Sequence, residues 1–213
     1  MAIRKVVEYS LGWLLSSVKG HDDKLFFKIP AFADYPEPTI TVESPSLGPS
    51  NSPMGIEYAS ASTGGQDKFP DLTWSPPAPI ASEVKEYLVV AEDPDAPIPT
   101  PPLHGMYYAI PPGKTQIVSG DLDLDTTKTE NGAKWVKGGF RAGANRRGNI
   151  YMGARPPCGH GPHRYFFQVV ALKEKLDLTK LSNVATREEV VENVREKVLG
   201  WGVWIGVFEN KWG

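Results

Sequence analysis

The sequence predicts a mainly β (α+β) protein, an antiparallel β-sandwich with peripheral helices near its N-terminus and C-terminus. Short apolar runs bounded by turn residues outnumber helical patterns, and the loops between these runs are irregular in length. The 20 prolines and 21 glycines are more than a helical bundle tolerates. A chain of 213 residues is long enough for one domain with a substantial core.

An amphipathic helix is expected over residues 1–20, with its end near Gly20, and a single domain over residues 21–213. We expect this helix to lie on the surface of the domain. The alternatives are a membrane-surface helix or a mitochondrial presequence, although Glu8 and the scarcity of arginine disfavour a presequence. The apolar residues that recur at helical spacing are Ile3, Val6, Val7, Leu11, Leu14, Leu15 and Val18.

The remaining elements are mostly strands. Capping-box residues Thr186 and Glu189 predict the start of a helix that ends at Gly200. Its buried face would carry Val190, Val191, Val194, Val198 and Leu199. The strand-like runs cover residues 39–43, 69–74, 87–91, 103–110, 166–172 and 201–208.

The run at 87–91 leads directly into the sequence Glu-Asp-Pro-Asp-Ala-Pro at 92–97. Pro94 has no backbone N–H and biases Asp93 toward an extended conformation, so regular pairing is expected to end there. Asp93 and Asp95 would therefore lie at the mouth of a rigid strand. An acidic side chain at this position can face a cavity.

Two histidines lie where other strands are expected to begin. His104 opens the run at 103–110, and His163 and Tyr165 directly precede the run at 166–172. If the three strands are neighbours, Asp93, His104, His163 and Tyr165 converge on one polar pocket. Imidazole and hydroxyl donors suit phosphate oxygens, and the carboxylate suits an ammonium group, so such a pocket can bind a zwitterion.

These motifs resemble the two signature regions of the phosphatidylethanolamine-binding protein (PEBP) family. They are Asp-Pro-Asp-Ala-Pro at 93–97, a histidine at the start of a later strand, and Pro-Pro…Gly-Pro-His-Arg-Tyr within 156–165. The family includes Raf kinase inhibitor proteins, plant flowering-time regulators, yeast carboxypeptidase inhibitors and microbial homologues. The resemblance extends from about Phe69 to Phe208, and residues 200–206 are most similar to the microbial and fungal branch.

The resemblance implies a PEBP-like fold, in which a smaller sheet packs on a large central sheet with helices at the C-terminal end. It also implies lipid binding through a pocket for phosphate-type anions and phosphoethanolamine head groups, and a kinase or protease as protein partner. The edge of the pocket is expected to be less aromatic than in animal members, since Pro101-Pro102-Leu103 precedes the histidine. The implied ligand-binding residues are Asp93, His104, Pro156, Pro157, His163 and Tyr165.

Asp95 and Arg164 are expected to form a structural clamp between the two motif loops, because a planar guanidinium can hold a carboxylate through two bonds. The glycine-rich basic loop at 140–149 is interpreted as a surface segment. Alternatively, it forms a rim that attracts anionic head groups or acidic partners.

Three chemical alternatives involve the same residues. Asp93, His104 and His163 can serve as the acid and base groups of a cofactor-free isomerase, cyclase or hydrolase-like enzyme. Cys158 with His163 and Asp93 can act as nucleophile, base and orienting group. Cys158, His160 and His163 have ligand types that zinc uses. We predict no metal and no cofactor, since Pro162 stiffens the loop and no nucleotide-binding, GxSxG or HExxH motif is present.

The charge, hydropathy and cysteine content of the chain limit its partners and its location. The formal net charge of −2 disfavours nucleic acid as a partner. No apolar run approaches the roughly 20 residues of a membrane span, so membrane contact is expected to be peripheral at most. The single cysteine excludes an internal disulfide and fits a reducing compartment, so a cytoplasmic location is expected.

Overall fold

The structure, a computed structural model, describes residues 2–128 and 132–212, with side chains described from residue 6 onward in the first helix. Met1 and Gly213, the outer ends of the predicted helix and domain, and the side chain of Ile3 lie outside this description. No helix within the described ranges is long and apolar enough to cross a membrane.

Over the described residues, the large sheet has seven strands in the order β2-β10-β9-β4-β5-β8-β7. All neighbours are antiparallel except β2 and β10, which are parallel, so the predicted sandwich with a large, mainly antiparallel sheet is confirmed and the sheet is mixed only at this edge. Strand β2 has two residues, which lie in a proline- and serine-rich loop beside β10. The sequence of this loop shows no strand pattern. The bounds are β2 (Ser52–Pro53), β10 (Val198–Phe208), β9 (His163–Leu172), β4 (Glu86–Glu92), β5 (Leu103–Ile110), β8 (Arg141–Ala142) and β7 (Lys134–Trp135).

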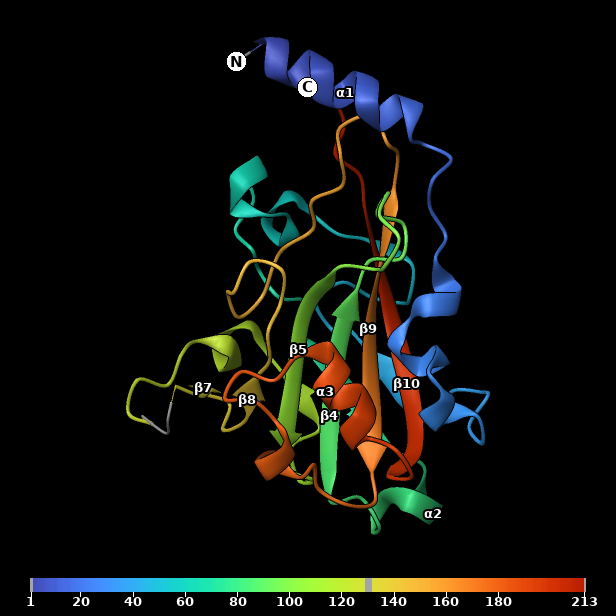
Figure 1. Cartoon of the computed structure of the whole chain (residues 1–213), viewed down its shortest axis with the longest axis vertical. Helices are drawn as coiled ribbons and strands as arrows, with labels where there is room; N and C mark the ends of the chain where they lie inside the picture. The colour runs from blue at the N-terminus through green and yellow to red at the C-terminus, as the bar shows by residue number, and fades with distance from the viewer. Residues whose placement is uncertain (1, 129–131, 213) are drawn as a thin grey trace.

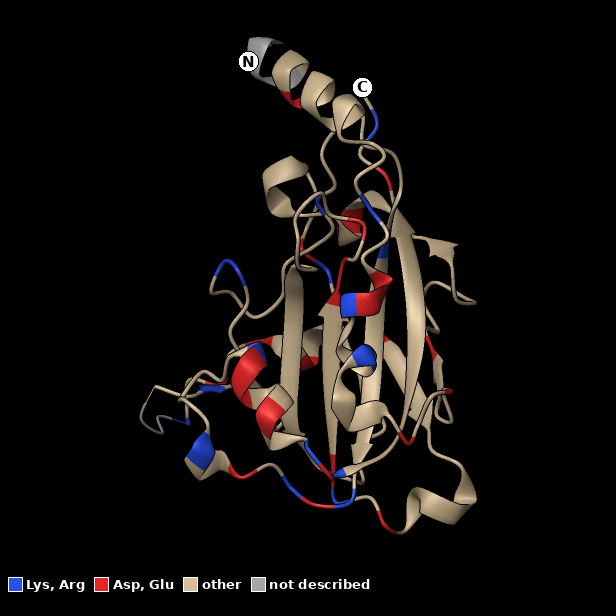
Figure 2. Ribbon diagram, turned by 45° about the vertical axis from the view of Figure 1, so that its right-hand side comes forward, with Lys and Arg blue, Asp and Glu red and all other residues tan. Residues whose placement is uncertain are grey.

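Helix α1 (Ala2–Leu14) lies across one end of the sheet, near the C-terminus of the chain (Figure 1). It is shorter than the expected 20 residues, and turns continue the chain from its end to Lys19. Most of its described length carries no charge (Figure 2). Between residues 6 and 14 only Gly12 is buried, while Leu11 and Leu14 are 53% and 67% exposed. The helix therefore touches the domain narrowly and does not bury its apolar face against it.

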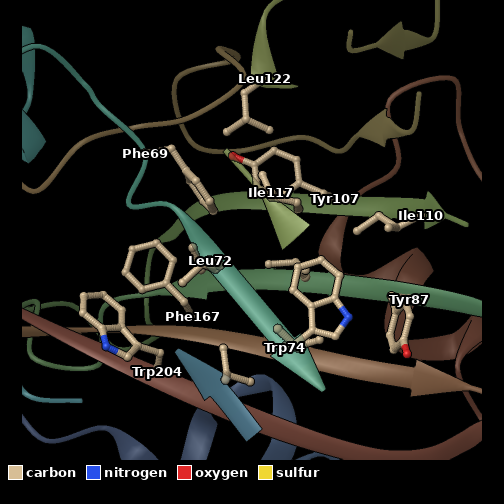
Figure 3. Packing of buried hydrophobic residues seen from close by; sticks show 14 of the residues in the cluster. Phe69, Leu72, Trp74, Tyr87, Tyr107, Ile110, Ile117, Leu122, Phe167 and Trp204 are labelled. Atoms are coloured by element: carbon tan, nitrogen blue, oxygen red, sulfur yellow. The ribbon is translucent and has the colours of Figure 1, made fainter. Parts of the chain in front are cut away.

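A small sheet packs on one face of the large sheet. In the described ranges it comprises β1 (Thr41–Glu43), β3 (Leu72–Ser75) and β6 (Gln116–Ile117), in the order β1-β3-β6. Leu72 and Trp74 project from β3 into an aromatic core (Figure 3). The ring of Phe69 meets those of Tyr107 and Phe167 edge-on, with centroids 5.7 and 5.6 Å apart. Edge-to-face packing of large rings adds stability beyond the burial of area and fixes how the two sheets sit together.

Helix α3 (Arg187–Asn193) packs on the opposite face of the large sheet (Figure 1). Its predicted capping box is present, since Thr186 and Glu189 cap each other's backbone N–H groups. Its predicted end at Gly200 is wrong. The helix stops at Asn193, Glu196 has a φ of +60° in the turn that follows, and Val198 already pairs with β9. Valines suit a strand as well as a helix, so apolar spacing alone did not show the reversal.

Short helical segments connect these elements. Helix α2 (Ala78–Ala81) precedes β4 at the end of the sheet opposite α1 (Figure 1). The 3-10 turns within the described residues are η1 (Asp22–Lys24), η2 (Phe26–Lys28), η3 (Pro30–Phe32), η4 (Ile56–Tyr58), η5 (Ala61–Thr63), η6 (Ser119–Leu122) and η7 (Leu178–Lys180).

Candidate functional site

The end of β4 and the beginnings of β5 and β9 meet at the end of the sheet nearest α1 (Figure 1). β4 lies between β5 and β9 and is antiparallel to both, so its last residue, Glu92, pairs with Leu103 on one side and Phe166 on the other. Side chains at these three strand ends, or one residue beyond them, therefore lie close together. Asp93, His104 and His163, which are far apart in the sequence, line one pocket of about 390 Å³.

Asp93 is held at the floor of this pocket by the turn that ends β4. Its backbone N–H donates to the Pro102 carbonyl, and its Oδ1 accepts a hydrogen bond of 2.9 Å from the backbone N–H of Asp95. Its Oδ2 lies 2.8 Å from Nδ1 of His163. Asp93 and His163 are almost completely buried, at 3% and 0% exposed. The carboxylate orientation is therefore fixed before any ligand arrives.

A series of hydrogen bonds leads from Asp93 to the N-terminal segment. Nε2 of His163 lies 2.7 Å from Nδ1 of His160, and Nε2 of His160 lies 2.8 Å from the carbonyl oxygen of Leu15. A carbonyl only accepts, so His160 Nε2 must donate to Leu15. Burial and the neighbouring His163 lower the pKa of His160, which favours its neutral ring.

These directions determine where the remaining protons lie. In a neutral His160 whose Nε2 donates, Nδ1 accepts, and His163 Nε2 must be the donor to it. One further proton lies between His163 Nδ1 and Asp93 Oδ2. Whichever atom holds it, the Asp93–His163 pair carries no net charge, and both ring nitrogens of His163 are already engaged.

His104 is oriented by a hydrogen bond from the opposite wall. Its Nδ1 donates to the carbonyl oxygen of Met152 at 2.6 Å, and its ring meets that of Tyr165 edge-on at 5.0 Å. Burial lowers the pKa of His104, an effect that the charge of Asp93 opposes only in part. The neutral ring then has a lone pair on Nε2, the nitrogen not used by Met152. His104 is therefore able to take a proton from a bound molecule.

Three arginines give the pocket its positive charge. Arg146 and Arg147 come from the loop at 140–149, and Arg155 precedes the Pro-Pro pair. That loop is attached to β5, because Asn145 Nδ2 donates to the His104 carbonyl, and Arg147 donates to Ser60 Oγ at 3.1 Å. Within residues 2–128 and 132–212, none of the three arginines forms a salt bridge with a carboxylate. The loop at 140–149 was interpreted either as a surface segment or as a rim that attracts anionic groups. Its position beside the pocket agrees with the second interpretation.

The predicted ligand-binding residues divide into two groups. Asp93, His104, Pro157 and His163 line the pocket. Pro156 and Tyr165 lie behind the lining: the Pro156 carbonyl accepts from Asn210, and the Tyr165 hydroxyl accepts from the backbone N–H of Arg155. Burial and the charge of Asp93 raise the pKa of Tyr165, so its hydroxyl keeps its proton.

Sequence reasoning named the loop of Arg146 and Arg147 only as an alternative rim, and it did not place Arg155 or the apolar wall among the site residues. A basic residue next to the Pro-Pro motif and two arginines in a glycine-rich loop were visible signals for the cationic wall. The apolar wall had no comparable signal, because its members come from two separate loops. These members are Ala96, Pro97, Ile98, Pro102 and Met152.

Arg164 and Asp95 form the predicted contact between the motif loops. Arg164 Nε and Nη2 donate to the two oxygens of Asp95 at 2.9 and 2.8 Å, and the backbone N–H of Arg164 adds a third bond. The guanidinium also holds Asp22 through two bonds, and Gly20 donates its N–H to Asp95. Burial raises the pKa of Asp95, but the bonds and charge of Arg164 outweigh this and lower it overall.

Two of the chemical alternatives, the cysteine nucleophile and the zinc site, both depend on Cys158. Cys158 lines a separate hollow that also includes Glu8 and Trp212, outside the pocket formed by Asp93 and His163. His160 and His163 use their ring nitrogens for each other, for Leu15 and for Asp93. Across the described part of the chain, no group of three or more His, Cys, Asp or Glu side chains has a metal-binding arrangement.

Comparisons with known proteins support the resemblance noted in the sequence. The family model "Phosphatidylethanolamine-binding protein" matches residues 46–209. "Phomoidride biosynthesis cluster protein B" of Talaromyces stipitatus is 46% identical over 99% of this chain and 84% of its own length. A protein of the same name from another fungal species is 43% identical over 99% and 98%. The crystal structure of Escherichia coli YbcL, described as "a new member of the mammalian PEBP family", superposes with a TM-score of 0.64 at 25% identity, covering 81% of this chain and 99% of YbcL.

Proposed function

Because the chain belongs to the phosphatidylethanolamine-binding protein family, we propose that its pocket binds a small organic anion or zwitterion, such as phosphate or a phosphoethanolamine head group. The observation that carries this proposal is the cationic wall of Arg146, Arg147 and Arg155. Guanidinium groups bind phosphate and carboxylate oxygens through paired hydrogen bonds.

The charges on the floor of the pocket are compatible with either type of ligand. The Asp93–His163 pair is neutral overall, so it does not cancel the charge of the three arginines. Carboxylate oxygens accept more than one hydrogen bond, so Asp93 retains capacity for an ammonium group. A phosphate-bearing zwitterion would thus place its phosphate against the arginines and its ammonium group near Asp93.

Calorimetric titration with inorganic phosphate and with phosphoethanolamine tests this proposal. Replacing one guanidinium, in Arg146→Gln or Arg155→Gln, removes a charge-assisted hydrogen bond and is expected to weaken phosphate binding about tenfold. Arg195→Gln is the matched control, because it removes the same charge from a side chain 68% exposed and outside the pocket lining. Binding that all three variants weaken equally, or that the wild type lacks, would refute the proposal.

A second candidate function is acid–base catalysis on the bound anion without a cofactor. The observation that favours it is the buried His104, whose lowered pKa leaves a neutral base in the same pocket as the Asp93–His163 pair. Two relatives that match almost the whole chain are named as proteins of a biosynthesis cluster, which also favours chemistry. Asp93, His104 and His163 would then be the catalytic residues.

Solvent deuterium separates binding from catalysis. Small metabolites extracted from the source organism would be incubated with the protein in D₂O and analysed by mass spectrometry for new carbon-bound deuterium. The wild type is expected to label or convert at least one metabolite, and His104→Gln to lose this activity while still binding phosphate. Absence of any labelled or converted metabolite would leave the binding function and exclude proton-transfer catalysis on those compounds.

Modulation of a kinase or protease and a cytoplasmic location remain predictions from the sequence. They are supported by the family resemblance and by the single cysteine, respectively.

A further inference from the structure

His160 lies behind the floor of the ligand pocket and is not part of its lining. Its side chain is almost completely buried between His163 and the N-terminal segment, and one of its ring nitrogens is bonded to each of them. Neither of the functions proposed above gives this residue a role. A buried imidazole in direct contact with a pocket residue can nevertheless control the protons of that residue.

The protons of this region can be counted from the hydrogen bonds. Three bonds in series join Asp93 to His163, His163 to His160, and His160 to the Leu15 carbonyl, with lengths of 2.8, 2.7 and 2.8 Å. Each bond needs one proton, and a carbonyl supplies none, so the two imidazoles and the carboxylate together hold three. Two neutral imidazoles beside an ionised carboxylate hold only two. The third proton therefore makes the series neutral, wherever along it that proton lies.

The Leu15 carbonyl makes this third proton necessary. A neutral His160 has one ring proton, and the bond to Leu15 keeps that proton on Nε2, so Nδ1 can only accept from His163. Without an acceptor at position 160, Nε2 of His163 can keep its lone pair while Nδ1 donates to Asp93. The Asp93–His163 pair would then carry a charge of −1 at the floor of the pocket.

The charged groups around His160 favour its neutral ring. Burial, His163 and Lys19 of the N-terminal segment all lower the pKa of His160, and the charge of Asp93 opposes them only in part. An imidazole that stays neutral is the acceptor that the series requires. The other titratable or charged groups that face the series are His104, Arg147, Asp95, Arg164 and Tyr165.

We propose that His160 is a positioning residue that holds the Asp93–His163 pair in its uncharged form, so that the pocket favours doubly charged anions. This inference rests on the proposed anion-binding function and specifies the charge of the ligand. An uncharged floor leaves the attraction of the arginine wall unopposed. A floor with a charge of −1 would repel a dianion about twice as strongly as a monoanion of similar size, because the Coulomb energy is proportional to the ligand charge.

Sulfate and methanesulfonate test this charge effect, since both stay fully ionised near neutral pH and differ by one unit of charge. Calorimetry at pH 8 would compare the wild type with His160→Leu, whose side chain is apolar and neither donates nor accepts. The variant is expected to bind sulfate about tenfold and methanesulfonate about threefold more weakly. It should also take up as much as one proton more per sulfate bound, which the binding heats in buffers of different ionisation enthalpy measure.

His160→Gln is the matched control, because an amide has a donor for the Leu15 carbonyl and an acceptor for His163. It is expected to bind both anions within about twofold of the wild type. A residue that only fills space would instead tolerate leucine at least as well as glutamine, and its loss would weaken both anions equally. Equal losses for the two anions in His160→Leu, or the same losses in His160→Gln, would overturn the inference and leave the proposed function intact.

Nitrogen-15 NMR of histidine-labelled protein without ligand separates the inference from the proposed function. At pH 8 the His163 Nε2 atom is expected to carry a proton in the wild type and in His160→Gln, and to lose it in His160→Leu. An Nε2 atom without a proton in the wild type would overturn the inference, whether or not an anion binds and whether or not the variants fold. If Nε2 carries its proton but neither phosphate nor sulfate binds, the proposed function fails, and the preference for dianions fails with it.

Discussion

Asp93 and Asp95 have the same side chain, are two residues apart and are both almost completely buried, yet their surroundings differ in kind. Asp95 is bound by a permanent cation, since Arg164 donates to both of its oxygens and Asp22 balances the rest of the guanidinium. Asp93 is bound by a group that can gain or lose a proton, His163, and it faces a pocket.

This difference shows what separates a structural acid from a candidate functional one. A guanidinium remains charged at all accessible pH values, so the contact of Asp95 with Arg164 is a fixed link between two loops. The contact of Asp93 with His163 is instead a hydrogen bond through a shared proton, and both residues line the pocket that a ligand would enter. Substitutions at the two aspartates should therefore affect stability and ligand binding to different degrees.

The largest effect is expected from Asp95→Ala. The change leaves Arg164 and the N–H groups of Gly20 and Arg164 without their buried acceptor. Breaking a largely buried pair costs up to 3–5 kcal/mol, and we expect about 3 kcal/mol here because the Arg164 side chain is 36% exposed. The melting temperature, measured by circular dichroism, should fall by about 6–12 °C for a chain of this size. An unchanged melting temperature would refute the structural clamp.

A smaller effect on stability is expected at Glu86, a carboxylate that no arginine clamps. Burial raises its pKa from 4.5 to about 6, although the N–H of Ala109 and two lysines act in the opposite direction. A raised carboxyl pKa contributes stability that is fully present below about pH 4.5 and is lost as the pH rises through about 6. This difference in pKa corresponds to about 2 kcal/mol.

Glu86→Gln, which stays neutral, is therefore expected to be more stable than the wild type near pH 8, by up to about 2 kcal/mol or roughly 4–8 °C. Near pH 4.5 the two proteins should melt at similar temperatures. Melting curves that differ by the same amount at both pH values would show that burial does not control this carboxyl.

The sequence predicted the described strands of three or more residues because their apolar runs are local signals, and it predicted the contact of Asp95 with Arg164 because each lies in one of the two motifs. The apolar runs at 87–91 and 103–110 have few alternatives to buried strands, and Pro94 marks where the first of them ends. Arg164 adjoins His163 in the motif, so its proximity to Asp95 followed once the strands were neighbours. By contrast, the glycines and arginines of the loop at 140–149 could not show which wall of the pocket this loop would form.

What the sequence did not predict depends on contacts between distant segments. The bond from His160 to Leu15, the sharing of Arg164 with Asp22, and the cationic wall each require a loop position that no periodicity encodes. The orientation of α1 has the same origin. Its apolar spacing indicated burial on the domain, but the described residues of the helix make few close contacts, among them those of Gly12 with the Cys158 carbonyl and of Tyr9 with Gly159.

The smallest and most selective effect is expected from Asp93→Asn, which tests the functional half of the contrast. The variant keeps an acceptor near Asp95 and removes the carboxylate, and His163 then needs no additional proton, so the pair stays neutral. Phosphate affinity should change by less than about twofold, since the arginines are untouched, whereas phosphoethanolamine should bind about tenfold more weakly because its ammonium group loses a carboxylate oxygen as hydrogen-bond acceptor. Calorimetry with both ligands measures the difference. Equal changes for the two ligands would mean that Asp93 does not contact the ammonium group, and its role would then be to position His163.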